Sequence, residues 1–128
     1  MPDHPPHRAL MLFSHGSPDP EWTLPFTTLQ DMIADGYPEL PVALAFLAPA
    51  RPTFEDVVAQ LVQSGVTEIV VAPVFLSRGG HVKRDLPEMV AVASATHGVA
   101  IRVLPTLGEV EVLLGAMAEW IAQSALKE

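Results

Sequence analysis

The sequence contains no cysteine, which excludes a disulfide framework, a thiolate nucleophile and any metal centre with cysteine ligands. A metal site would have to use histidine, carboxylate or water. The first residues, MPDHPPHR, lack the apolar run of a signal peptide. No apolar stretch reaches the roughly 18 residues that a membrane-spanning helix needs. We therefore expect a cytoplasmic protein with no membrane partner.

Basic residues are scarce. There are 7 Lys and Arg against 15 Asp and Glu, which gives a formal net charge of −8. This charge repels phosphate backbones, so we expect no nucleic-acid partner. The 128 residues and a hydrophobic fraction of 49% suit one domain with a substantial core. We expect residues 1–128 to form that single domain, with residues 1–7 flexible.

Short apolar runs alternate with segments of helical spacing along the whole chain. This alternation predicts a short doubly wound α/β fold, in which four parallel strands in the order 2-1-3-4 carry helices on both faces. The β-branched third run suits a central strand. The predicted strands are 8–14, 41–47, 67–75 and 100–104, and the predicted helices are 23–36, 53–65, 85–98 and 109–126.

Some helix details follow from local signals. Asp85, with Pro87 in the first turn, predicts the start of the third helix, and Gly98 predicts its end. The methionines and tryptophans on apolar stretches are expected to fill the core, among them Met11, Met32, Met89, Met117, Trp22 and Trp120.

Two histidines follow neighbouring strands of the predicted sheet. His15 comes directly after the first strand and His81 after the third. Doubly wound sheets bind ligands beyond the carboxyl ends of their strands, where the strand order reverses. We therefore expect His15 and His81 to face one cavity. His4, His7 and His97 are interpreted as solvated or structurally hydrogen-bonded residues.

Three of the seven basic residues, Arg78, Lys83 and Arg84, lie within seven positions beside His81. One interpretation is that they are solvated charges. The other is that they bind carboxylates or phosphates of an anionic ligand. Arg51, after the second strand, would add a fourth cation at the same edge.

Gly79 and Gly80 would let a flat ligand approach the main chain, although they also suit an ordinary flexible turn. Neither glycine segment forms a G-x-G-x-x-G or Walker motif, so no motif supports nucleotide binding. Ser14 and Ser17 lie outside any G-x-S-x-G elbow, which argues against a serine hydrolase.

Together, LFSHGSPDPEW, AFLAPARPTFEDVVAQLVQSGVTEIVVAPVF and LSRGGHVKRDLPEM resemble the small CbiX/SirB type of class II tetrapyrrole chelatase, over nearly the whole chain. The resemblance implies a chelatase-like half unit that inserts cobalt, iron or nickel into sirohydrochlorin or a related tetrapyrrole. It implies no cofactor beyond that substrate metal ion, and a homodimer that completes the cavity. The family's metal-site histidines correspond to His15 and His81.

These residue types suit that chemistry. Metal insertion displaces two pyrrole protons, and neutral imidazole can bind the ion weakly or accept a proton. A site with open positions releases its ion more easily than a closed cage. The basic cluster suits a substrate with several carboxylates. We expect substrate contacts at Ser17, Arg51, Gly79, Gly80, Lys83 and Arg84.

The chain departs from the resemblance at one position. Many relatives carry a glutamate after the FL of the second strand, whereas this chain has Ala48. Asp85 and Glu88 are possible substitutes, although Asp85 also suits a helix cap. The missing carboxylate supports an alternative function, a non-catalytic tetrapyrrole or metal carrier. A histidine phosphatase is disfavoured because Ser14 stands where that class has arginine before its histidine.

Overall fold

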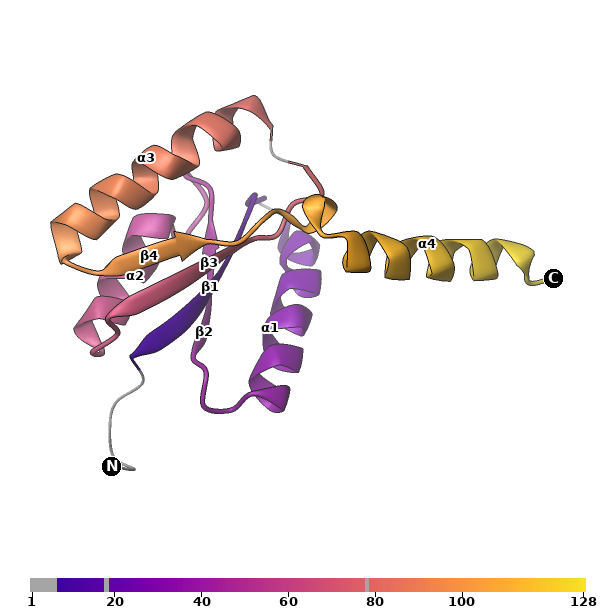
Figure 1. Ribbon diagram of the computed structural model, residues 1–128, viewed down its shortest axis with the longest axis horizontal. Helices are drawn as coiled ribbons and strands as arrows, with labels where there is room; N and C mark the ends of the chain where they lie inside the picture. The colour runs from indigo at the N-terminus through magenta and orange to yellow at the C-terminus, as the bar shows by residue number, and fades with distance from the viewer. Residues whose placement is uncertain (1–6, 18, 78) are drawn as a thin grey trace.

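The apolar runs form one parallel four-stranded sheet in the computed structural model, which describes residues 7–17, 19–77 and 79–128 apart from the side chain of His81. The strands pair in the order β2-β1-β3-β4, as predicted. This order places β1 and β3 in the centre of the sheet (Figure 1). The strands are β1 (Arg8–Ser14), β2 (Val42–Phe46), β3 (Glu68–Pro73) and β4 (Ala100–Val103).

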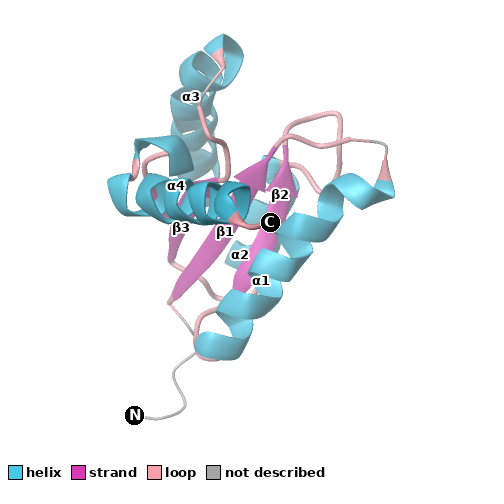
Figure 2. Ribbon diagram, turned by 90° about the vertical axis from the view of Figure 1, so that its right-hand side faces the viewer, coloured by secondary structure: helices cyan, strands magenta, loops and turns pink. Residues whose placement is uncertain are grey.

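Helices lie on both sides of the sheet, with α1 on one side and α2 and α3 on the other (Figures 1 and 2). The four α-helices are α1 (Leu24–Gly36), α2 (Phe54–Gln63), α3 (Gly80–His97) and α4 (Glu111–Leu126), and two 3-10 turns are η1 (Pro20–Thr23) and η2 (Leu107–Glu109). Within the described part of the chain, no helix combines the length and apolar character that a membrane crossing requires.

The hydrophobic core lies between the sheet and the pair α2 and α3. Alternate residues of β1, among them Met11 and Phe13, are fully buried on this side. The ring of Phe13 meets the rings of Phe54 and Phe75 edge-on, with centroids 5.7 and 6.0 Å apart. Because Phe75 follows β3 directly, this packing fixes the chain at the carboxyl edge of the two central strands.

The amino-terminal segment is only partly described, because residues 1–6 lie outside the described residues. At position 7, the carbonyl of His7 accepts hydrogen bonds from the backbone N–H groups of Thr67 and Glu68, both at 2.8 Å. These bonds tie the start of β1 to the start of β3.

The prediction for the start of α3 was wrong. The helix begins at Gly80 rather than Asp85, with Gly79 as an extended N-cap residue, and Pro87 lies in its interior. The sequence interpretation took Asp85 and Pro87 as a cap and a first-turn proline, but the helix continues through Pro87 although an interior proline removes one hydrogen bond and crowds the carbonyl four residues earlier. The predicted end was correct, since Gly98 adopts the left-handed conformation with φ 62°.

The last helix departs most from expectation. Helix α4 extends away from the sheet instead of covering it (Figure 1). Met32, Met117 and Trp120, which were expected in the core, are therefore exposed. The prediction assumed that each helix covers the sheet of its own chain. Of the four described methionines that were expected in the core, only Met11 is fully buried.

Candidate functional site

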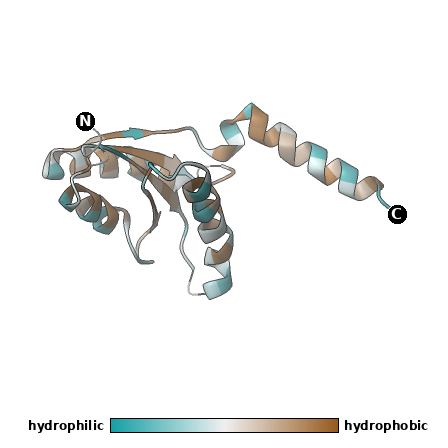
Figure 3. Cartoon of the chain, turned by 90° about the horizontal axis from the view of Figure 1, so that it is seen from below, coloured by the Kyte–Doolittle hydropathy of each residue, from teal (hydrophilic) through white to brown (hydrophobic). Residues whose placement is uncertain are grey.

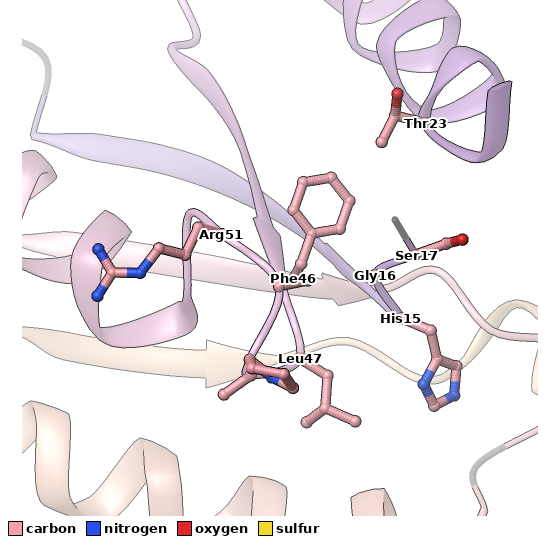
Figure 4. A pocket seen from close by; sticks show the side chains of 10 residues that line it. His15, Gly16, Ser17, Thr23, Phe46, Leu47 and Arg51 are labelled. Carbon is pink, nitrogen blue, oxygen red and sulfur yellow. The ribbon is translucent and has the colours of Figure 1, made fainter. Parts of the chain in front are cut away.

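A cleft of about 530 Å³ opens at the carboxyl ends of β1 and β2. Its volume is within the usual range for small-molecule sites, roughly 300–1,000 Å³. The lining comes from the loop after β1, from the end of η1 and from the loop after β2 (Figure 4). The lining residues are His15, Gly16, Ser17, Thr23, Phe46, Leu47, Ala48, Pro49, Ala50 and Arg51.

His15 is an exposed residue immediately after the buried Ser14. Its ring meets the ring of Phe75 at 68°, with centroids 4.7 Å apart. Its carbonyl accepts a hydrogen bond from the indole N–H of Trp22 at 2.9 Å and one from the Ser14 hydroxyl at 3.2 Å. The backbone of His15 is thus held from both sides while the ring faces the cleft.

Trp22 therefore has a role that the sequence interpretation missed. It was expected to be a packing residue, but it is about half exposed and positions the main chain of His15. The apolar residues around Trp22 do not predict that its indole N–H donates to the carbonyl of His15, seven residues earlier.

Gly16 lets the loops after β1 and β2 approach each other closely. A Cβ atom at this position would collide with the Cβ of Ala50. The φ angle of Gly16 is not in the left-handed region, so space rather than backbone conformation requires glycine. The Leu47 N–H also donates to the Ser14 carbonyl at 2.9 Å. The HGS motif contained this signal, but it was interpreted through His15 and Ser17 and not through its glycine.

The loop after β2 presents apolar side chains and a backbone with two cis peptide bonds, Ala48–Pro49 and Arg51–Pro52. Ala48, at the position where the family resemblance led us to expect a glutamate, lines the cleft. Among the residues that the structure describes, no group of three or more histidines and carboxylates could hold a metal ion.

The two carboxylates considered as substitutes lie elsewhere. Asp85 and Glu88 line a different hollow between α2 and α3, together with Phe54, Glu55, Met89 and Val92. The structure therefore does not bring them to the cleft of His15. His97, expected to be structural, lies in the same region, where its Nε2 atom is 2.6 Å from a carboxylate oxygen of Glu55.

Arg51 lines the cleft with its backbone side, but its guanidinium points away from His15 (Figure 4). It lies 3.9 Å from the carboxylate of Asp56, and the side chain is 77% exposed. The pKa of Asp56 is lowered, first by the hydrogen bond from the backbone N–H of Thr53 and to a smaller extent by the charge of Arg51.

The other predicted contacts are at the start of α3. Lys83 and Arg84 are exposed on the helix itself, not in a loop. Lys83 lines a second hollow of about 540 Å³, whose other lining residues are Leu76, Ser77, Thr106, Gly108 and Glu109. Among the described atoms beyond its chain neighbours, none lies within 4 Å of a Cβ built on Gly79.

The second predicted histidine is only partly located. His81 is the second residue of α3, and its side chain lies outside the described residues, as does all of Arg78. The structure thus brings His15, Ser17 and Arg51 to one cleft. Ser17 accepts a hydrogen bond from the Asp19 N–H at 3.1 Å.

Residues 9–124 match the family model described as CbiX. Two curated relatives are named sirohydrochlorin cobaltochelatase. The one from Methanothermobacter thermautotrophicus is 33% identical over 73% of this chain and 64% of its own length. The one from Methanopyrus kandleri is 36% identical over 66% of this chain and 59% of its own length. The matches therefore span less than two thirds of these relatives.

Solved structures share the fold. A cobalamin (vitamin B12) biosynthesis CbiX protein from Marinobacter aquaeolei superimposes with a TM-score of 0.81 and 28% identity, covering 92% of this chain and 97% of that one. The sirohydrochlorin chelatase SirB from Bacillus subtilis subspecies spizizenii, in complex with cobalt, gives a TM-score of 0.74 and 24% identity over 91% of this chain and 50% of SirB. The likeness to SirB concerns the fold.

Proposed function

The chain belongs to the CbiX family, and from this premise we propose that it is a metal chelatase that inserts cobalt, iron or nickel, as a divalent ion, into sirohydrochlorin or a related tetrapyrrole. The observation that carries the proposal is the cleft at the carboxyl edge of the sheet, where His15 is exposed beside the two central strands. Doubly wound folds bind ligands beyond the carboxyl ends of their strands, at the point where the strand order reverses; His15 adjoins this β1/β3 point, and the described lining of the cleft comes from the β1 and β2 side.

His15 has two functions in this proposal. Its neutral imidazole binds the incoming metal ion weakly, and it accepts a proton when the pyrrole nitrogens release theirs. Insertion of one divalent ion releases two pyrrole N–H protons: His15 accepts one on the lone pair that the departing ion vacates, and the second goes to His81 or to water, so the charge of the macrocycle and metal balances. Trp22 holds the backbone carbonyl of His15 and Phe75 contacts its ring, and neither of these two contacts uses a ring nitrogen.

We propose that His81 is the second metal-binding histidine. Its support is its sequence position, which is two residues after the open turn at Gly79 and next to the strand that neighbours β1. Two histidines leave most coordination positions to water, and such a site can transfer its ion to four ring nitrogens. Imidazole binds cobalt, iron and nickel alike, so the donor set fits all three.

The basic residues Lys83 and Arg84 attract the carboxylates of the tetrapyrrole in this proposal. Both are exposed in the first two turns of α3, where the helix N-terminus also favours negative charge. Gly79 and Gly80 leave room for a flat macrocycle above the turn, and Ser17 lies at the wall of the cleft. Arg51 contributes less, because its guanidinium points toward Asp56.

A carrier that binds tetrapyrrole or metal without turnover is the second candidate function. The apolar wall at Ala48 favours it, because a carboxylate there would help to bind metal or accept pyrrole protons. The two functions differ in one measurable property. A chelatase forms many equivalents of metallated product, whereas a carrier holds at most about one equivalent.

The test is anaerobic incubation of the chain with sirohydrochlorin and Co²⁺, Fe²⁺ or Ni²⁺, followed by the absorption spectrum of the metallated product. The spontaneous rate without protein is subtracted. We expect multiple turnovers with at least one metal ion. Stoichiometric binding of sirohydrochlorin with no rate above background would instead support the carrier, and no binding of substrate or metal would reject both functions.

We also propose that residues 1–128 act as one unit of a homodimer. A cleft formed by the loops of one copy would leave a planar macrocycle open to water on one side, and a second copy could cover it. The chain aligns with half of the SirB chain, so two copies contain as much structure as that larger protein. Light scattering at micromolar concentration should give the mass of a dimer, and an active monomer would contradict this proposal.

A further inference from the structure

Helix α4 is apolar around most of its circumference and exposed along its whole length. Only Glu111 and Glu119 among its 16 residues are charged. Figure 3 shows its apolar residues extending away from the rest of the chain. Helices with this composition are normally buried. The large exposed side chains are Val112, Leu113, Leu114, Met117, Trp120, Ile121 and Leu126.

The direction of α4 is fixed by the turn that precedes it. Thr106 is fully buried, and its hydroxyl donates to the Glu109 carboxylate at 2.7 Å. The Leu107 N–H donates to the Phe75 carbonyl at 2.9 Å. A Cβ at Gly108 would collide with the carbonyl of Leu76, so η2 packs directly on this backbone. The turn is therefore firmly attached to the segment after β3, and it points α4 outward.

The side of the sheet that carries α1 has an uncovered apolar groove. Helix α1 has no buried residue, and Met32 is 67% exposed. The groove has a volume of about 600 Å³, and among its described lining residues only Thr28 has a polar side chain. Its lining residues are Leu24, Pro25, Phe26, Thr28, Leu29, Met32 and Val74.

The groove beside α1 and the helix α4 are two apolar surfaces that do not pack against each other within one copy. A doubly wound sheet needs helices on both faces, and α4 is not a crossover between two strands of this sheet, so the handedness of crossovers does not fix which face it covers. In this chain the side of α1 has α1 alone, while α4 lies away from it (Figure 2). Each copy therefore has one exposed apolar helix, α4, and one uncovered apolar groove beside α1.

We propose that α4 of one copy packs into the groove beside α1 of a second copy, and that the exchange is reciprocal. The proposal rests on the homodimer proposed above but not on metal insertion. A two-fold axis satisfies both copies at once, because the same pair of surfaces meets twice.

The exposed area supports a second copy as the occupant. The chain exposes 8439 Å², whereas a compact monomer of 13.8 kDa exposes about 6,600 Å². The 8439 Å² also includes residues outside the described part of the chain. The exposed helix α4 and the groove therefore account for only part of the excess over a compact monomer. A 16-residue helix is about 24 Å long. Two such helices in two grooves provide an area on the order of the 1,200–2,000 Å² that stable interfaces bury.

The first test changes the apolar surface of α4. We expect the double variant Trp120→Glu/Ile121→Glu to raise the dimer dissociation constant at least about thirtyfold in analytical ultracentrifugation. The control is Gln123→Glu/Ser124→Glu, which adds the same two charges to the same helix at polar positions and should leave the constant within about threefold. Near-UV and far-UV circular dichroism check that the sheet remains folded in both.

The second test uses the absence of cysteine in the chain. A copy with Met32→Cys and a copy with Ile121→Cys, one of them carrying a mass tag, are mixed and treated with a short bismaleimide. We expect the mixed crosslink between the two copies. The control copy has Glu39→Cys, in the exposed loop between α1 and β2, and should give no mixed crosslink with Ile121→Cys above background.

The outcomes separate the helix exchange from the other proposals. A dimer that the Trp120 and Ile121 variant does not weaken would overturn the exchange but keep the dimer. A wild-type monomer at all concentrations would overturn both. A single chain carrying both Met32→Cys and Ile121→Cys that crosslinks only within itself would mean that α4 covers its own groove, which also overturns the exchange. None of these results depends on chelatase activity.

Discussion

At the scale of single residues, the neighbours His15 and Gly16 have different roles in the same loop: His15 belongs to the candidate site, and Gly16 allows two loops to pack closely. The ring of His15 faces the cleft and contacts Phe75, so it contributes little to the core. Gly16 has no side chain to contribute, yet the loops after β1 and β2 meet where its Cβ would be. Substitution at these two positions should therefore separate chemistry from folding.

Substitution of His15 should reduce activity without unfolding the chain. We expect His15→Ala to slow metal insertion at least roughly ten- to a hundredfold, the low end of what loss of a general base costs. If His81 is the second metal-binding histidine, as proposed above, His81→Ala should slow metal insertion to a similar extent. The melting temperature of His15→Ala should barely change, because the ring is exposed and the backbone contacts of Trp22 remain. Initial rates and thermal melting measure the two quantities.

His97→Ala is the control for the histidine variants. His97 of α3 pairs with Glu55 of α2, and neither residue is among those that line the cleft. Its removal should leave the insertion rate unchanged. The role of His15 would be rejected if the folded His15→Ala chain, at saturating metal, metallated sirohydrochlorin at close to the wild-type rate.

Gly16→Ala should have the opposite profile. The added methyl group must displace Ala50 or the loop that carries it, and such overpacking typically costs about 1–3 kcal/mol of unfolding free energy. Denaturant unfolding measures this loss. The matched control is Gly36→Ala, at the end of α1, where a Cβ meets nothing within 4 Å. The control should lose no stability and should gain up to about 1 kcal/mol, because alanine loses less backbone entropy than glycine on folding; equal losses in both variants would contradict the close packing at Gly16.

At the scale of elements, α2 has the best-defined start in the chain. The Thr53 hydroxyl accepts from the Asp56 N–H at 3.1 Å, and the Asp56 carboxylate accepts from the Thr53 N–H at 3.0 Å. Thr53→Ala should therefore cost about 0.5–2 kcal/mol in denaturant unfolding. Thr23→Ala is the comparison, because Thr23 precedes α1 without a capping bond from its side chain. It should cost less than Thr53→Ala.

The same capping box predicts a pH dependence. The pKa of Asp56 is lowered from its usual 3.8 in the folded chain, chiefly by the Thr53 N–H. A lowered pKa in the folded state means that the carboxylate stabilises the fold above pH 3.8 and that this contribution is lost as pH falls below it. Wild type should therefore be more stable than Asp56→Asn near neutral pH, and the gap should close in acid. Urea unfolding at several pH values measures it, and a constant gap would refute the assignment.

The helices and strands show which features of the fold the sequence pattern could predict. Strand positions followed from the apolar runs and turn residues, the order 2-1-3-4 was taken as the common one for short doubly wound sheets, and the capping box of α2 followed from its sequence. The start of α3 did not, because Asp85 and Pro87 imitate a helix start five residues inside the real helix. The direction of α4 did not either, since an apolar helical pattern predicts burial but does not say against which surface.

At the scale of the whole molecule, the strand order places the candidate site but not its details. The order 2-1-3-4 was enough to put His15 at the edge between β1 and β3. It could not show that Trp22 holds the His15 carbonyl, that Gly16 lets two loops meet, or that Asp85 and Glu88 face another hollow. These features depend on loop conformations that no period in the sequence encodes.

The charge distribution of the whole molecule leads to the last prediction. The chain carries a net charge of −8, so it repels an anionic substrate except near the exposed Lys83 and Arg84. Lys83→Ala/Arg84→Ala should weaken sirohydrochlorin binding more at low salt than at high salt, because salt already screens part of the attraction. Fluorescence titration across salt concentrations measures this. Arg8→Ala/Arg102→Ala is the control, since it removes the same charge from two arginines that pair with Glu68 on the strands. Identical losses at all salt concentrations, or an equal effect in the control, would show that Lys83 and Arg84 do not attract the substrate locally.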